Sequence, residues 1–419
     1  GGGRGSNGRR NQAGKKGKSA GGGGQKPTDA KDFVTWSEGM RLEGSPLGVS
    51  YLVEAYVASG TFSRVFKVRR VSLAENAEEG KSATDHFFAA KVMRKQDAYI
   101  QYSSDAQKEG EMLKTLERAQ LASGGDVLTM RCLDSFETKD TSGCTYWCLI
   151  LEWLDVSIFD LVRANGNKGL HLSMVRVILK QLLSQLSILQ NLNITHTDIK
   201  HKNCCLVDGE HFMAPVGPGG KSSLILTKPL AKFIDYGNAV FEGDKKTHPI
   251  HTKQFRAPEV LLNVNAGWGP PSDIWTVGVT AAFMVSGQLI FNTHNPGELL
   301  RKQVEALGPF PESFLRGARD GRACRAAERA VGEIASPQLS VLVGLASSQA
   351  DDAQAQCADL LSRMLTPDPS LRITAAAALE HPFLTSDEPS IPARPKNAEL
   401  RNLGSSSVAQ GRMKQQSEW

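Results

Sequence analysis

An acid, a lysine and an amide lie close together in the stretch ITHTDIKHKN, where Asp198 and Asn203 are five residues apart with Lys200 between them. A second acid, Asp235, follows two apolar residues in FIDYGNA and precedes a flexible Tyr-Gly pair. An enzyme that uses ATP needs oxygen ligands for Mg²⁺ and an acid oriented at the attacking hydroxyl. Asn203 and Asp235 suit the first need, Asp198 suits the second, and Lys200 can neutralise the transferred group. These residue types therefore indicate phosphoryl transfer.

Lys91 lies in FFAAKVM, a short apolar stretch that we expect to form a strand. A lysine directed toward the interior is costly unless it is paired with anions. Glu109, eighteen residues later in a predicted helix, can supply one partner, and nucleotide phosphates can supply another. The alternative is a surface lysine on an edge strand. The stretch ASGTFS, residues 58–63, holds one of the three glycines expected in a loop over phosphates, so by itself it indicates only a turn.

The elements that must position these residues change character along the chain. An alternating apolar pattern around a glycine-containing turn predicts a hairpin over residues 51–71, and a buried strand is predicted over 146–154. Helical spacing of apolar residues predicts helices over 105–121 and 173–192, and helices dominate from there to residue 383. We therefore expect an α+β fold in which a small β-rich lobe is joined to a larger helical lobe.

Two further motifs, RAPEV at residues 256–260 and SDIWTVGV at residues 272–279, follow where a substrate-binding platform should lie. Each motif is ambiguous alone, but together and in this order residues 50–384 resemble a eukaryotic protein kinase. The resemblance implies the bilobal kinase fold, ATP and Mg²⁺ as cofactors, and proteins as substrates.

The resemblance also implies a role for each motif residue. Asp198 would be the catalytic base, and Lys200 would lie beside the γ-phosphate. Lys91 would contact the α- and β-phosphates, with Glu109 as its helix partner, and Asn203 and Asp235 would bind Mg²⁺. The remaining residues would contact the nucleotide. Ala58, Gly60 and Ser63 lie in the phosphate loop, and Val65, Ala89 and Leu206 would form the apolar clamp around the base. Leu151 is at the gatekeeper position, Glu152 and Leu154 are in the hinge, and Ser157 would contact the ribose. Two structural contacts are implied as well, an ion pair between Glu259 and Arg372 and support of the catalytic loop by Asp273.

Within the kinases, the sequence resembles the CMGC group, because Arg256 precedes Ala-Pro-Glu and a long insert follows TAAFMVSGQLIF. Other stretches, such as GTFSRV and SGQLIFNTHNPGELL, favour the Prp-four type of pre-mRNA-processing kinase. The alternatives are a Clk-like dual-specificity kinase of serine–arginine-rich (SR) proteins, whose His-Thr-Asp triplet this chain shares, and a pseudokinase scaffold. The presence of Lys91, Asp198, Asn203 and Asp235 together argues against the scaffold. The resemblance implies spliceosomal or SR-type substrates and a nuclear protein that could also be cytoplasmic.

Several positions depart from the usual kinase pattern. Thr197 replaces the arginine with which many kinases bind a phosphorylated activation loop. Pro249 stands where this branch often has a tyrosine, so we expect activity without phosphorylation of an activation-loop tyrosine. Tyr236 adds a hydroxyl that needs a partner, and Lys253 stands where CMGC kinases commonly have arginine.

Composition sets the remaining limits. The chain has 419 residues, of which 40% are hydrophobic and 22% charged, which is typical of a globular protein with more than one core. The longest apolar runs considered, such as VGVTAAFMV, are shorter than the roughly 20 residues of a membrane span, so no membrane association is expected. Seven cysteines without a CxxC pair indicate reduced thiols of the cytosol or nucleus.

The charge of the chain is concentrated at its N-terminus. The first 28 residues hold seven basic residues and no acid, although the formal net charge of the whole chain is +5. Such a tail could contact RNA weakly, could act as a nuclear import signal, or could only be solvated. We expect a monomer with four regions: a basic glycine-rich disordered tail (1–32), a kinase N-lobe with an extension (33–152), a C-lobe with a CMGC-type, helical insert near 317–357 (153–384), and a loose C-terminal tail (385–419).

Overall fold

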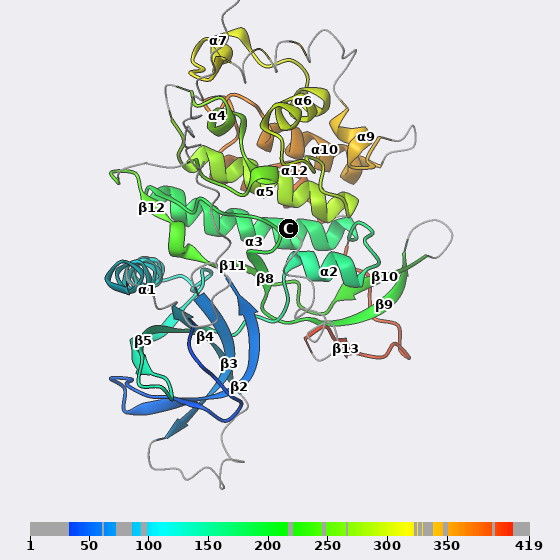
Figure 1. Ribbon diagram of the computed structural model, residues 1–419. Helices are drawn as coiled ribbons and strands as arrows, with labels where there is room; N and C mark the ends of the chain where they lie inside the picture. The colour runs from blue at the N-terminus through cyan, green and yellow to red at the C-terminus, as the bar shows by residue number, and fades with distance from the viewer. Residues whose placement is uncertain are drawn as a thin grey trace, which may run out of the picture.

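The structure, a computed structural model, has a small β-rich lobe and a larger helical lobe, as predicted (Figure 1). Expectations for residues 1–32, for much of the insert at 317–357 and for residues 405–419 of the C-terminal tail fall outside the described residues. The structure describes residues 33–60, 63–72, 86–93, 99–216, 221–244, 249–264, 267–321, 325, 329, 338–346, 351–387 and 390–404.

The small lobe is built on a six-stranded antiparallel sheet in the order β1-β2-β3-β4-β6-β5. Its strands are β1 (Arg41–Leu42), β2 (Val49–Ser59), β3 (Ser63–Ser72), β4 (Phe87–Met93), β5 (Cys132–Lys139) and β6 (Thr145–Glu152). The predicted hairpin is β2–β3, and the predicted strands at residues 87–93 and 146–154 are β4 and β6. Because side chains alternate along a strand, Leu149 and Leu151 of β6 face helix α1 (Tyr99–Ala122), whereas Cys148 and Ile150 join the core on the other face.

An N-terminal extension covers the face of this sheet that α1 leaves open. Trp36 stacks on Tyr56 of β2, with ring centroids 5.6 Å apart, and tilts against Phe66 of β3 at 5.4 Å. Val34 is almost fully buried in the same core, and its carbonyl accepts a hydrogen bond from Arg64 at 3.0 Å. The extension therefore packs on the two strands whose connection is the predicted phosphate loop.

The large lobe is centred on α3 (Leu172–Asn191), which matches the helix predicted at 173–192, and on α5 (Pro270–Ser286). Every residue from Ser272 to Met284 is buried, as expected of a helix in the core of the lobe. By length and composition α3 could span a membrane, although the sequence led us to expect no membrane association. Of its most apolar 18-residue stretch, 61% is buried in the protein, which is typical of a core helix. The other helices are α2 (Ile158–Ala164), α4 (Pro258–Leu261), α6 (Pro296–Leu307), α7 (Glu312–Arg316), α9 (Leu339–Leu342), α10 (Asp352–Met364), α11 (Ala375–Leu379) and α12 (Pro382–Thr385), with short 3₁₀ turns η2 (Tyr236–Asn238) and η3 (Lys253–Phe255).

Short antiparallel strand pairs in the large lobe frame the loops at its surface. They are β7 (Ile194–Thr195) with β12 (Val240–Phe241), β8 (Cys204–Leu206) with β11 (Ala231–Phe233), and β9 (Glu210–Val216) with β10 (Lys221–Leu226). The β9–β10 hairpin was not predicted, because helices were expected throughout this region.

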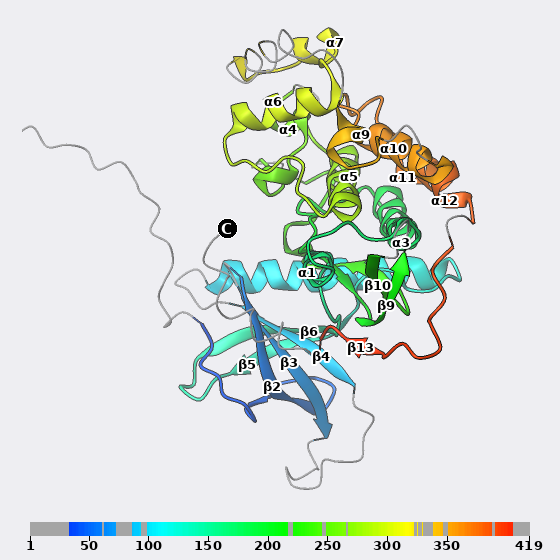
Figure 2. The same ribbon diagram turned by 90° about the vertical axis from the view of Figure 1, so that its right-hand side faces the viewer.

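The expectation of a loose C-terminal tail is wrong for residues 390–404. Strand β13 (Arg401–Asn402) pairs with β9 and extends the hairpin to three strands (Figure 2). Leu403 is only 6% exposed, and its amide donates to the carbonyl of Gly209 at 3.2 Å. The tail is ordered because it buries an apolar side chain and satisfies the hydrogen bonds of a sheet edge.

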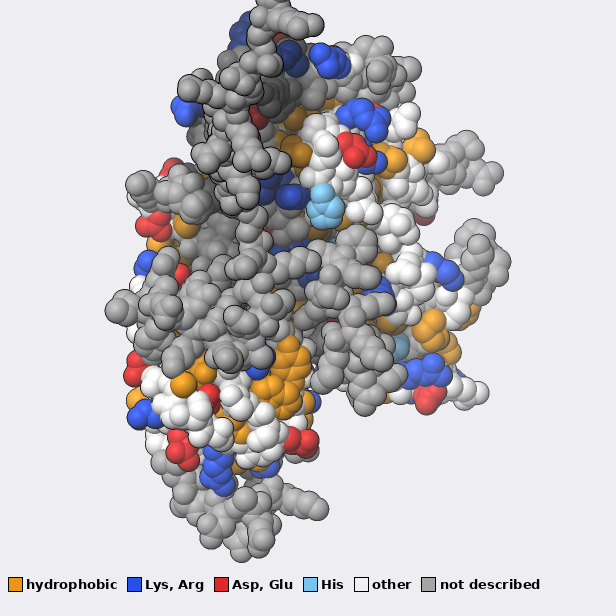
Figure 3. All heavy atoms as spheres, viewed as in Figure 1, with side chains coloured by type: hydrophobic (Ala, Val, Ile, Leu, Met, Phe, Trp, Pro, Cys, Tyr) orange, Lys and Arg blue, Asp and Glu red, His pale blue; other side chains and the backbone are white. Residues whose placement is uncertain are grey.

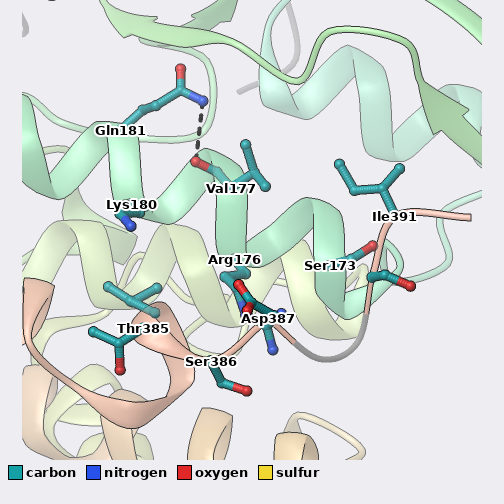
Figure 4. A pocket seen from close by; sticks show the side chains of 11 residues that line it. Ser173, Arg176, Val177, Lys180, Gln181, Thr385, Ser386, Asp387 and Ile391 are labelled. Carbon is teal, nitrogen blue, oxygen red and sulfur yellow. Dashed lines mark hydrogen bonds between the residues drawn. The ribbon is translucent and has the colours of Figure 1, made fainter.

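A pocket of about 310 Å³ lies where this tail leaves α12 and passes α3 (Figure 4). Ser173, Val177 and Gln181 of α3 lie on one side, and Thr385 and Ile391 lie on the other. None of the predicted site residues lines this pocket, so it is separate from the predicted nucleotide site.

Candidate active site

The loop from His196 to Asn203 is bound to the N-terminal part of α5. Asp273 accepts hydrogen bonds from the backbone amides of His196 at 2.6 Å and Thr197 at 3.1 Å, which confirms the predicted support of this loop. Thr197 has φ 72°, a region that side chains rarely adopt, so these contacts must stabilise a strained backbone. The hydroxyl of Thr197 donates to the carbonyl of Asn238 at 2.8 Å and so connects the loop to the segment after Asp235.

Three polar side chains surround the carboxylate of Asp198. The ammonium of Lys200 lies 2.7 Å from Oδ2, and the amide nitrogen of Asn203 donates to the backbone carbonyl of Asp198 at 2.9 Å and to Oδ2 at 3.2 Å. The hydroxyl of Thr252 donates to Oδ1 at 2.9 Å and accepts from Lys200 at 3.0 Å. The carboxylate is thus fixed in orientation while remaining partly accessible, as a general base must be.

A second cluster joins Lys91 on β4 to Glu109 on α1 and to Asp235. The ammonium lies 2.7 Å from Glu109 Oε2 and 2.8 Å from Asp235 Oδ1, so the predicted pairing of Lys91 with Glu109 is present. Burial alone would lower the pKa of Lys91, but the two carboxylates raise it above its ordinary value. Lys91 in turn lowers the pKa of Asp235, whereas burial raises that of Glu109. The lysine therefore stays charged, as a phosphate ligand requires.

The backbone around Asp235 brings its side chain to this cluster. Asp235 has φ 66° and ψ 69°, and the next residues form the turn η2. A side chain at Gly237 would approach Glu109 Oε2 at 3.3 Å, so glycine permits the close approach of the turn to α1. Tyr236 is buried with its ring 4.6 Å from that of His196, and its hydroxyl has no hydrogen-bond partner among the described residues.

The donor set fits magnesium bound with a nucleotide. The amide of Ile234 donates to the carbonyl of Asn203 at 2.9 Å, which sets Asn203 beside Asp235. Asn203 uses its amide nitrogen on Asp198, so its amide oxygen, together with the Asp235 carboxylate, provides hard oxygen donors. The described residues hold no group of three or more His, Cys, Asp or Glu side chains that could bind a metal by themselves. Two protein ligands completed by phosphate oxygens suit Mg²⁺, and these assignments remain predictions.

Strand register brings the predicted adenine contacts together between the lobes. Val65 pairs with Lys91, Ala89 pairs with Leu151, and Leu206 donates its amide to the carbonyl of Val156 at 2.8 Å. The phosphate-loop residues lie at the β2–β3 turn, where the amide of Gly60 donates to the carbonyl of Ser63 at 2.8 Å, and Ala58 pairs with Val65. Leu154 follows β6 and packs against the core.

Two side chains assigned to nucleotide contacts have other partners in the structure. The hydroxyl of Ser157 donates to Asp160 at 2.7 Å and caps α2, so a ribose contact would have to share it. The carboxylate of Glu152 accepts from Lys232 at 2.7 Å and from the amide of Arg131 at 2.9 Å. Any contact of Glu152 with adenine is therefore left to its backbone.

Sequence reasoning missed Thr252 and Lys232. Thr252 precedes the RAPEV motif by four residues, and only folding of this segment onto the catalytic loop places it on Asp198. Lys232 precedes Asp235 and also donates to the carbonyl of Thr129 at 3.1 Å, which connects the hinge, β11 and the loop before β5. A lysine in a strand gives no local indication of such a partner.

The predicted structural ion pair is present and fully buried. Arg372 forms two hydrogen bonds with Glu259, at 2.8 and 2.9 Å, and neither side chain is exposed. Ser272 donates to the same carboxylate at 2.7 Å. The pair connects α4, the start of α5 and the segment before α11, and so holds the segment that carries Thr252.

Comparisons with known proteins agree with this geometry. A family model of the protein kinase domain matches residues 51–384. The chain is 29% identical over 374 residues to the serine/threonine-protein kinase AFC1 of Arabidopsis thaliana, covering 83% of this chain and 74% of AFC1. It is 27% identical over 346 residues to the human dual specificity protein kinase CLK1, covering 81% of this chain and 67% of CLK1.

A solved kinase structure is similar to this chain in fold. The crystal structure of the PF14_0431 kinase domain aligns with a TM-score of 0.66 and 26% identity, covering 85% of this chain and 100% of that one. The relatives support a Clk-like kinase of the CMGC group, and the narrower Prp-four assignment remains a prediction. From its family match and its two polar clusters, the chain belongs to the protein kinase family.

Proposed function

We propose that this ATP-dependent protein kinase phosphorylates serine or threonine in proteins of pre-mRNA splicing. The observation that carries the catalytic part is the position of Lys91, whose ammonium lies within 3 Å of both Glu109 and Asp235. A kinase needs both this lysine and the metal-binding acid at the phosphates, and the contact between Lys91 and Asp235 places the two groups side by side. A scaffold that had lost catalysis would have no need to keep the arrangement.

The residues divide the work of transfer. Asp198 is oriented by Lys200, Asn203 and Thr252 to accept the proton of the substrate hydroxyl. Lys200 and Lys91 offset negative charge on the transferred and the remaining phosphates. Magnesium held by Asn203 and Asp235 would supply further charge neutralisation at the phosphates.

The activation segment has a support that needs no phosphate. Arg256 donates from Nε to the carbonyl of Ile250 at 3.0 Å and from a terminal nitrogen to that of His251 at 3.0 Å. These bonds favour activity without phosphorylation of this segment, in agreement with the absence of a tyrosine between Tyr236 and Arg256.

The proposal also covers the substrates, the cellular location and the oligomeric state of the kinase. Sequence resemblance favours splicing proteins in the nucleus, a Prp-four-type kinase and a monomer, with the basic residues of 1–28 available for RNA. Two relatives, human CLK1 and lkh1 of Schizosaccharomyces pombe, are dual specificity protein kinases, which supports a second candidate, a kinase that also phosphorylates tyrosine. Identification of the phosphorylated amino acids on a splicing-protein substrate separates the two candidates.

The test uses protein made in bacteria and treated with phosphatase. With Mg²⁺ and ATP it should transfer phosphate to protein serine or threonine, while Asp198→Asn, which keeps the shape but not the base, should lose nearly all of this rate. Equal rates for the two proteins would contradict the catalytic assignment. Activity that appears only after activation-segment phosphorylation would contradict the proposed independence.

A further inference from the structure

Positive charges that the reaction does not use lie beside the catalytic base. Lys202 follows Lys200 by two residues, Arg163 is at the end of α2, and Lys253 follows Thr252; all three side chains are exposed. We call these three residues the cationic shelf. Lys and Arg side chains are visible between α2 and α6 on the face shown in Figure 3.

A single aromatic ring positions two members of the shelf. The ammonium of Lys202 lies 4.9 Å from the ring centroid of Phe159, and the guanidinium of Arg163 lies 5.5 Å from the same centroid. Cation–π contacts hold charged groups at fixed places while leaving their outer sides in water. The two charges are therefore oriented rather than freely solvated, which distinguishes them from an ordinary polar surface.

Phe159 is in turn fixed to the catalytic loop. Its amide donates to the carbonyl of His201 at 3.1 Å, and the two rings lie 5.0 Å apart. His201 is buried and is packed against Phe255 and Phe283 as well, with ring centroids 5.1 and 4.6 Å apart. Because these contacts join α2 to the catalytic loop, we expect Lys202 and Arg163 to keep their position relative to Asp198.

The third member, Lys253, directly follows the residue that contacts the catalytic base. Thr252 touches Asp198, so the side chain of Lys253 begins one residue from the position where a substrate hydroxyl must lie. Lys200 is paired with Asp198, and the neighbouring acid Asp160 is bound to the cap of α2.

We propose that the cationic shelf selects substrates in which an anionic side chain, a carboxylate or a phosphate, flanks the serine or threonine that accepts the phosphoryl group. The inference rests on the proposed kinase function and names its substrate class. An arginine flanking the acceptor would meet like charge, so an arginine-rich segment would be a poor substrate until some of its serines carry phosphate.

The experiment compares peptides that share one acceptor serine. The flanking residues are neutral, aspartate, phosphoserine or arginine, and kcat/KM is measured for the wild type, for Lys202→Glu and Arg163→Glu, and for Lys139→Glu as a control. Lys139 is exposed at the end of β5, on the other lobe, so its substitution makes the same change in net charge away from the cleft.

Wild type and control should prefer an anionic over a neutral flank by about two- to fivefold, as expected for exposed ion pairs, and should disfavour arginine. The preference should shrink as salt is added, and Lys202→Glu should abolish or reverse it. Preference for aspartate alone assigns the site to carboxylates, and preference for phosphoserine alone assigns it to a phosphorylated substrate. Equal rates for all flanks, or an unchanged preference in both shelf variants, would overturn the inference. Transfer to the neutral peptide reports kinase activity separately, and its absence with every peptide would overturn both proposals.

Discussion

At the scale of single residues, the geometry around Asp198 depends on a hydroxyl from a distant segment. Thr252 is fifty-four residues further along the chain, yet it contacts both Asp198 and Lys200. The hydroxyl donates to the base and accepts from the lysine, so it fixes the separation of two groups that act on opposite ends of the same transfer. Thr252 is therefore a positioning residue for the base.

We predict that Thr252→Val lowers kcat by about tenfold to a hundredfold, because small displacements of a catalytic group cost this much. Valine keeps the shape of threonine, and Thr252→Ser keeps the hydroxyl, so serine should restore most of the rate. Steady-state kinetics at saturating ATP measure both variants. A serine variant as slow as the valine variant would indicate that packing, and not the hydroxyl, matters.

At the scale of elements, the buried pair of Glu259 and Arg372 anchors α4 to the segment before α11. Removing one partner leaves an uncompensated charge in the interior. We predict that Arg372→Met lowers the free energy of unfolding by about 3–5 kcal/mol, and that the double variant Glu259→Leu with Arg372→Met recovers much of the loss. Denaturant unfolding of the large lobe measures both.

The same pair gives a pH dependence with a defined sign. Burial would raise the pKa of Glu259, but Arg372 and Ser272 hold it below its ordinary value of 4.5. A group with a lowered pKa in the folded state stabilises the protein above the pKa of the unfolded state and loses this contribution as the pH falls below it. The wild type should therefore lose stability below about pH 4.5 more steeply than the double variant. Parallel acid-unfolding curves would contradict this assignment.

At the scale of the whole molecule, the C-terminal tail connects the large lobe to the hinge. Its strand β13 pairs with β9, and Gly209 at the start of that hairpin donates to the carboxylate of Asp155 at 2.9 Å. A side chain at Gly404 would collide with the same carboxylate. Asp155 directly follows the predicted hinge, so the docked tail supports the segment between the lobes.

We predict that Leu403→Ala releases the tail, because truncation of a buried leucine removes most of its apolar contact. Cleavage by trypsin after the exposed residues Lys396 and Arg401 should become about tenfold faster or more, since proteolysis follows the population of the open form. The KM for ATP should rise as the hinge loses support. Leu400→Ala, in the same segment but 37% exposed, is the matched control and should change neither quantity. Equal cleavage of the two variants would show that Leu403 does not hold the tail.

The sequence by itself determined the elements and the identity of the chemistry. Apolar alternation predicted the β2–β3 hairpin and helical spacing predicted α1 and α3, because both patterns are local. The types and the order of the polar motifs indicated phosphoryl transfer, because the order of residues along the chain can be read without the fold. The β9–β10 hairpin could have been found in the same way, since Phe212 and Ala214 alternate with polar or exposed residues before a glycine- and proline-rich stretch.

Only the tertiary structure decided which distant groups meet. Thr252 on Asp198, Lys232 on Glu152 and β13 on β9 join residues that are 54, 80 and about 190 positions apart. The same structure put two cations on the ring of Phe159. A threonine, a lysine or a short polar strand has many possible partners in an unfolded chain. The partner is selected only when burial of the two cores brings particular faces together, and no periodicity of the sequence records that choice.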